Sequence, residues 1–130
     1  MSIKARFVHT NLIAQDWRRV AQFYERVFGC RRVPPERKLR GKWLEDGTGI
    51  SNAEIHGVHL LLPGYSEEGP RLEIFQYNHE EKRQGTEVNQ PGYAHIAFAV
   101  EDVEAARDAV IAAGGGSVGE IVSTDIPGPG

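Results

Sequence analysis

The sequence predicts an α+β fold made of two βαβββ modules, the second of which is truncated after β-α-β. The main observation is a repeat: residues 7–30 and residues 93–116 align at an offset of 86 residues, which places His9 on His95. Both copies read as a β-like stretch with a histidine, an aspartate, an amphipathic stretch and a glycine. The second observation is the strand-like alternation that follows the first copy. We therefore expect paired modules whose strands form a cupped mixed sheet.

The first predicted strand, residues 6–13, presents Phe7, His9, Asn11 and Ile13 on one face. Asp16 is suited to cap the next helix, because its carboxylate can accept hydrogen bonds from the first free backbone amides. Apolar residues then recur at helical spacing and predict one buried stripe: Trp17, Val20, Ala21, Tyr24, Val27 and Phe28. Gly29 predicts the end of this helix, because glycine readily adopts the left-handed backbone conformation that ends helices.

Three further strands complete the first module. Residues 30–33 predict a short strand that Pro34-Pro35 ends, because proline cannot donate to a sheet ladder. Residues 34–52 predict an extended loop with one helical turn near 42–46. Residues 53–62 and 71–77 predict a hairpin joined by a turn rich in glycine and proline.

The second module is shorter than the first. We expect one domain over residues 1–130, with module one at 5–78, a linker at 79–91 and a partial module two at 92–130. A strand at 92–100, a helix capped by Asp102 and a short strand at 117–123 are predicted, but two strands are missing. Either the protein continues beyond Gly130 or a partner chain completes the sheet, and we favour the first.

Composition excludes several classes of protein. A net charge of −3 argues against a nucleic-acid partner, which requires a basic surface. No apolar run is long enough to span a bilayer, and the N-terminus has no signal-peptide pattern. The single cysteine, Cys30, excludes an intrachain disulfide and fits a reducing compartment. We expect a cytoplasmic protein with no nucleic-acid or membrane partner.

The two equivalent histidines are the main candidates for chemistry. A single strand histidine is more often structural than a ligand, and that interpretation applies to His9 or His95 taken alone. Equivalent positions in two copies of one module favour a shared metal, because a pseudo-twofold axis would bring both imidazoles to one point. His56, His59 and His79 are interpreted as side chains without a ligand role.

Four segments make the chain resemble the vicinal oxygen chelate superfamily: FVHTNL, FYERVFG, LEIFQYN and GYAHIAFAVEDV. This superfamily includes glyoxalase I, methylmalonyl-CoA epimerase, extradiol dioxygenases and antibiotic-resistance proteins. The resemblance runs from about residue 6 to residue 123. It implies a divalent metal site with His9, Glu73 and His95 as ligands, and a fourth ligand, usually Glu, in a strand that would follow Gly130.

Glu73 has two interpretations. It could be a solvent-facing residue paired with Arg71 or with a base on the next strand. It also lies between Leu72 and Ile74 in a strand whose two faces both look covered, where an unpaired carboxylate is costly. The resemblance implies that Glu73 is both a metal ligand and a candidate catalytic base.

The resemblance implies a metal-dependent lyase or isomerase of the glyoxalase or epimerase type. The reaction would move a proton next to a carbonyl of a small oxygenated metabolite or its thiol or thioester conjugate. Imidazole and carboxylate ligands suit Zn, Ni, Co, Mn or Fe. The alternatives are an extradiol-type dioxygenase and a non-catalytic protein that binds a drug or another small molecule.

We also expect a homodimer in which one chain supplies His9 and Glu73 and the other supplies His95, with a site inside a single chain as the alternative. The partial second module would bury little on its own. We expect a second chain to cover two apolar features, the run His59-Leu60-Leu61-Leu62 and the side chains of Phe75 and Tyr77.

Overall fold

The computed structural model describes residues 2–83, 85 and 87–125 of the chain. The chain divides into two compact units, residues 1–80 and residues 81–130. The boundary falls inside the predicted linker.

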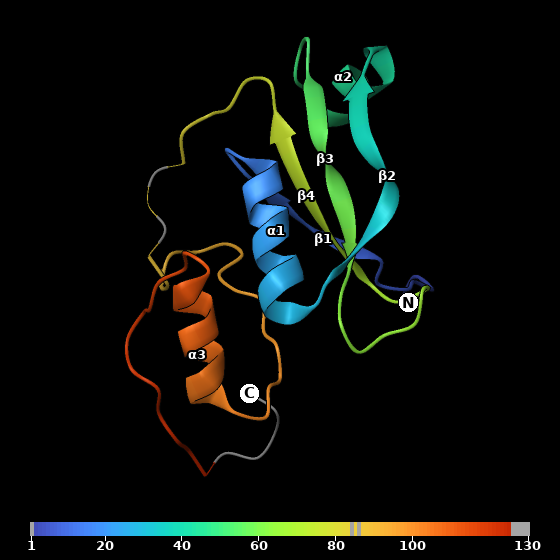
Figure 1. Cartoon of the computed structure of the whole chain (residues 1–130). Helices are drawn as coiled ribbons and strands as arrows, with labels where there is room; N and C mark the ends of the chain where they lie inside the picture. The colour runs from blue at the N-terminus through green and yellow to red at the C-terminus, as the bar shows by residue number, and fades with distance from the viewer. Residues whose placement is uncertain (1, 84, 86, 126–130) are drawn as a thin grey trace. The chain divides into compact units, whose positions relative to one another are not determined.

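The first unit is built on a four-stranded mixed sheet (Figure 1). Its strands are β1 (His9–Ile13), β2 (Arg31–Arg40), β3 (Glu54–Leu61) and β4 (Arg71–Tyr77), in the order β1-β4-β3-β2. β1 runs parallel to β4, while β4 with β3 and β3 with β2 are antiparallel. The predicted α+β class is confirmed.

Helix α1 (Trp17–Phe28) covers one face of this sheet. Asp16 caps it by accepting a hydrogen bond from the Arg19 amide at 3.3 Å, and Gly29 ends it in the left-handed region at φ 70°. The predicted stripe packs on β3 and β4 and forms the main core, whose buried members are Ala14, Trp17, Ala21, Cys30, Val58, Leu60, Leu72 and Ile74. We call this side of the sheet the α1 face.

The opposite face of the sheet has a smaller apolar cluster at one end. Leu44 from α2 (Lys42–Thr48) packs there with Ala53, Ile55 and Phe75. Since side chains alternate along a strand, His59 and Glu73 share this opposite face with Ile55 and Phe75. The polar side chains of His59 and Glu73 therefore lie next to the apolar cluster that covers one end of this face.

The predicted end of the second strand at Pro34-Pro35 is wrong, because β2 continues to Arg40. β2 is an edge strand, where proline removes no ladder hydrogen bond that a neighbour needs. The pairing with β3 shifts its register between Val33 and Arg37, so the two prolines lie in a bulge, and the bond between them is cis. Arg37 consequently belongs to the sheet and not to a loop.

The second unit contains one helix, α3 (Val103–Ala112), among its described residues. Asp102 caps it with φ −133° and ψ 103°, close to the −141° and 91° of Asp16. The two copies of the sequence repeat therefore share the same N-cap conformation. The glycine with positive φ at its end is Gly114, one residue before the predicted equivalent of Gly29.

The strands predicted at 92–100 and 117–123 are not formed in the described part of the second unit. Strands require a ladder partner, and sequence alternation does not provide one. The helix itself buries no residue.

The predicted need for a second chain to cover the β3–β4 hairpin is also wrong. β3 and β4 are the interior strands of the sheet, and Leu60, Leu61 and Phe75 are buried within the first unit. The edge strands of this sheet are β1 and β2.

No helix in the described ranges has the length and apolar character that a membrane span would require.

Core packing on the α1 face gives a direct test of the fold. Ile74→Ala is expected to lower the free energy of unfolding by about 2–5 kcal/mol, because Ile74 is completely buried and its removal leaves a cavity. Ile13→Ala removes the same atoms from a side chain that is 53% exposed and should cost less than about 1 kcal/mol. Urea denaturation followed by circular dichroism measures both, and equal losses would contradict the assigned core.

Candidate functional site

A buried carboxylate, Glu73, lies at the centre of the candidate site. It occupies the middle of β4, between two core residues, and is only 8% exposed. Burial of an ionised carboxylate is costly unless hydrogen-bond donors surround it. Of the two interpretations of Glu73, the solvent-facing one is therefore wrong.

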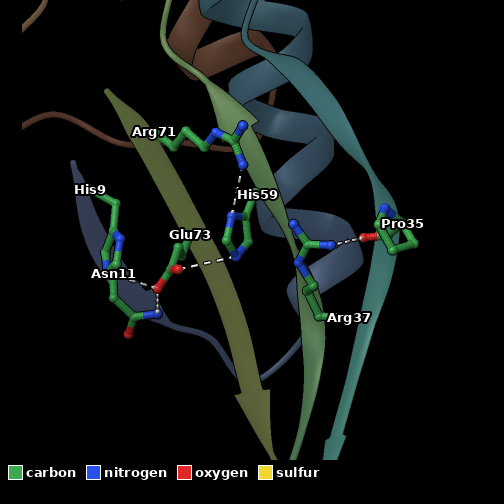
Figure 2. Close-up of polar contacts among 7 residues, drawn as sticks. All are labelled: His9, Asn11, Pro35, Arg37, His59, Arg71 and Glu73. Carbon is green, nitrogen blue, oxygen red and sulfur yellow. Dashed lines mark hydrogen bonds and ion pairs between the residues drawn. The ribbon is translucent and has the colours of Figure 1, made fainter. Parts of the chain in front are cut away.

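Three side chains from two neighbouring strands satisfy Glu73 (Figure 2). Asn11 Nδ2 donates to Oε1 at 3.2 Å, and His9 Nε2 lies 3.3 Å from the same oxygen. His59 Nε2 lies 3.1 Å from Oε2. Strand register explains the cluster, because Asn11 pairs with Glu73 across β1 and β4, and His59 pairs with it across β3 and β4.

The contacts of His59 define its protonation state. Arg71 Nη1 lies 3.5 Å from His59 Nδ1. A guanidinium can only donate, so Nδ1 accepts and the proton of the neutral ring resides on Nε2, which donates to Glu73. Burial lowers the pKa of His59, and the positive charge of Arg37 lowers it further, against the opposing effect of Glu73. His59 is therefore neutral at pH 7.

The distance between His9 and Glu73 is compatible with both side chains binding one metal ion. Donor atoms about 2.1 Å from an ion, at angles between those of octahedral and tetrahedral sites, lie roughly 3.0–3.4 Å apart. The 3.3 Å between His9 Nε2 and Glu73 Oε1 falls in this interval. A neutral imidazole with a carboxylate is also a donor set that zinc and other first-row divalent ions accept.

The structure brings together two of the three predicted ligands. His95 lies in the second unit, in an irregular segment before α3. Within the described ranges, no three side chains of the His, Cys, Asp or Glu types are grouped closely enough to hold an ion. A site shared by His9, Glu73 and His95 stays a prediction.

Sequence reasoning gave no functional role to Asn11, Arg37 or His59, and it considered Arg71 only as an ion-pair partner of Glu73. The signal for His59 is the register of the β3–β4 hairpin, in which Leu61 pairs with Arg71 and His59 consequently with Glu73. The connection over residues 62–70 is too long for its length to set that register. His56, assigned no ligand role, is exposed and points away from the face that carries His59.

Solved structures resemble this fold at low sequence identity. A glyoxalase family protein from Bacillus cereus matches with a TM-score of 0.80 and 18% identity, over 95% of this chain and 82% of that chain. The fosfomycin resistance protein FosX from Listeria monocytogenes, complexed with Mn(II) and 1S,2S-dihydroxypropylphosphonic acid, matches at 0.49 and 18%, over 86% and 71%. The fold likeness rests on the first of these. A comparison with curated proteins gives no match.

The family assignment comes from the sequence as a whole. The model of the Glyoxalase/Bleomycin resistance protein/Dioxygenase superfamily matches residues 6–126, which is nearly the entire chain. This range includes His9, Glu73 and His95, as well as all four strands of the first unit. The chain belongs to the Glyoxalase/Bleomycin resistance protein/Dioxygenase superfamily.

Proposed function

We propose that this protein is a metal-dependent lyase or isomerase that moves a proton next to a substrate carbonyl. The observation that supports it is the pair His9 Nε2 and Glu73 Oε1, 3.3 Å apart on the face of the sheet that α1 leaves free. The substrate would be a small oxygenated metabolite or a thiol or thioester conjugate of one.

His9 and Glu73 would hold a divalent ion from the first unit, with His95 as the ligand from the second. A bound ion would polarise a substrate carbonyl and stabilise the negative charge that develops beside it. Zn, Ni, Co, Mn and Fe all accept these donors.

Glu73 would also receive the proton as the general base. Its Oε2 is held by the neutral His59, whose side chain is 18% exposed, while its Oε1 points toward His9, whose side chain is 45% exposed. A substrate that enters from solvent would therefore meet Oε1, which can take up a proton only when it is not coordinated to the ion. Asn11 holds that same oxygen in position through its amide.

Metal content tests the ligand assignment. His9→Ala and Glu73→Gln are each expected to reduce the bound metal from about one ion per site to well below half, because each removes a donor atom. His56→Ala is the matched control, since His56 is an exposed histidine outside the cluster. Elemental analysis after metal loading and desalting gives the stoichiometry. Unchanged metal content in both site variants would contradict the proposal.

Proton exchange tests the reaction class without a known substrate. The metal-loaded protein, incubated in D₂O with a panel of hydroxy-ketones, hemithioacetals and acyl thioesters, is expected to place deuterium on the carbon next to the carbonyl. Glu73→Gln should slow this exchange by about 10²–10⁴-fold, the usual contribution of a general base. Glu67→Gln, which alters a largely exposed glutamate, is the control. Oxygen consumption with a catechol, in place of exchange, would contradict the assignment and indicate a dioxygenase.

We also propose that the protein is a homodimer in which His9 and Glu73 of one chain meet His95 of the other. Its support is that the first unit contributes only two of the three ligands, and that closed twofold dimers are common among symmetric oligomers. Light scattering at working concentration is expected to give twice the chain mass of 14.4 kDa.

Mixing two inactive variants tests shared sites. His9→Ala and His95→Ala, each poor in metal alone, should regain partial metal binding when their chains exchange, because a mixed dimer keeps one intact site. Absence of recovery after demonstrated subunit exchange would place the ligands within a single chain.

A further inference from the structure

Two arginines of the first unit differ from the others on its strands. Most of the strand arginines have carboxylate partners: Arg31 pairs with Glu67, Arg32 with Glu25 and Arg40 with Glu54. Arg37 and Arg71 form no ion pair within the part of the chain that the structure describes, although both are half-buried. A half-buried cation without a counterion carries an unfavourable desolvation cost.

Both guanidinium groups are held by neutral acceptors. Arg37 Nη1 donates to the carbonyl oxygen of Pro35 at 3.0 Å, and Arg71 Nη1 donates to His59 Nδ1 at 3.5 Å. A guanidinium has five N–H donors in a planar fork. Each group therefore uses one donor for its own orientation and keeps others for a ligand.

The two arginines approach the same imidazole from different strands. Figure 2 shows Arg37 on β2 and Arg71 on β4, with His59 of β3 between them. Gly57 lies opposite Arg37 in the register, and the Phe75 ring packs directly over it, since a Cβ on Gly57 would meet Phe75 Cδ1 at 2.7 Å.

The nearby carboxylate does not neutralise these charges. Glu73 is already bonded by Asn11 and His59 and contacted by His9. Arg37 and Arg71 therefore place two guanidinium groups on this face beside a single carboxylate whose contacts are already made. A planar or tetrahedral oxyanion matches the donor fork of a guanidinium and would supply the missing negative charge.

We propose that Arg37 and Arg71 form a binding site for an oxyanion group, a carboxylate or a phosphoryl group, carried by the substrate. The proposal rests on the proposed function only in making this anion part of a substrate that reacts at Glu73. Anion binding by the two arginines is itself independent of any metal.

Titration of metal-free protein with methylphosphonate and with acetate tests the site. EDTA treatment removes any ion that would bind these anions itself, and the imidazole signals of His59 in NMR spectra report binding near the arginines. Saturable shifts are expected for at least one probe, and the preferred probe distinguishes a phosphoryl from a carboxylate ligand. Arg37→Gln and Arg71→Gln should each lower the affinity for the preferred probe by about tenfold, since each removes a charged hydrogen-bond donor.

Arg40→Gln is the matched control, because it makes the same change in charge on the same strand at an exposed residue. It should alter the affinity less than about twofold. Equal weakening by all three variants would show non-specific attraction, and absence of saturable binding of either probe would also overturn the proposal. Circular dichroism confirms that each variant is folded.

Metal analysis of the same variants separates the two hypotheses. Arg37→Gln and Arg71→Gln should retain the metal content of the unchanged protein, because neither residue is a proposed ligand. Anion binding in a protein that takes up no metal would overturn the proposed function and leave the arginine site standing. Metal binding and proton exchange without anion binding would overturn the arginine site and leave the proposed function standing.

Discussion

The burial of one carboxylate constrains the rest of the candidate site. Glu73 lies in an interior strand at 8% exposure, where an ionised group is stable only with donors on both oxygens. β1 and β3 flank β4 and supply those donors, Asn11 and His59. Any slip of one residue in either register would send the donor to the α1 face, so the pairing of the strands and the satisfaction of Glu73 depend on each other.

Local signals in the sequence predicted much of this structure. Asp16 and Gly29 bound α1 as expected, and β4 spans the predicted residues 71–77. The same local logic worked for Asp102 in the second unit, since an N-cap needs only its own first turn. Alternation along β1 also correctly put His9 and Asn11 on the same face.

Non-local pairing limited the prediction of the remaining features. The identification of His59 required the register of a hairpin with a long connection, and that of Arg37 required a bulge at two prolines that a local pattern interprets as a strand end. The prediction of strands in the second unit was wrong for a related reason, because an alternating sequence does not supply the neighbouring strand with which hydrogen bonds must form. Features that depend on contacts between distant residues were therefore the ones that sequence patterns missed.

The distribution of polar and apolar groups explains why the candidate site lies on one face of the sheet. The α1 face is filled by the main core, which leaves no room for a solvated ligand. On the opposite face the α2 cluster closes one end with Phe75, whose ring centroid lies 5.8 Å from that of His59. A ligand on this face would thus have an apolar wall on one side and Arg37, Arg71 and the half-exposed His9 on the others. Under the two proposals, such a combination would orient a small substrate by its anionic end and its apolar side, and would bring the carbon between them toward Glu73.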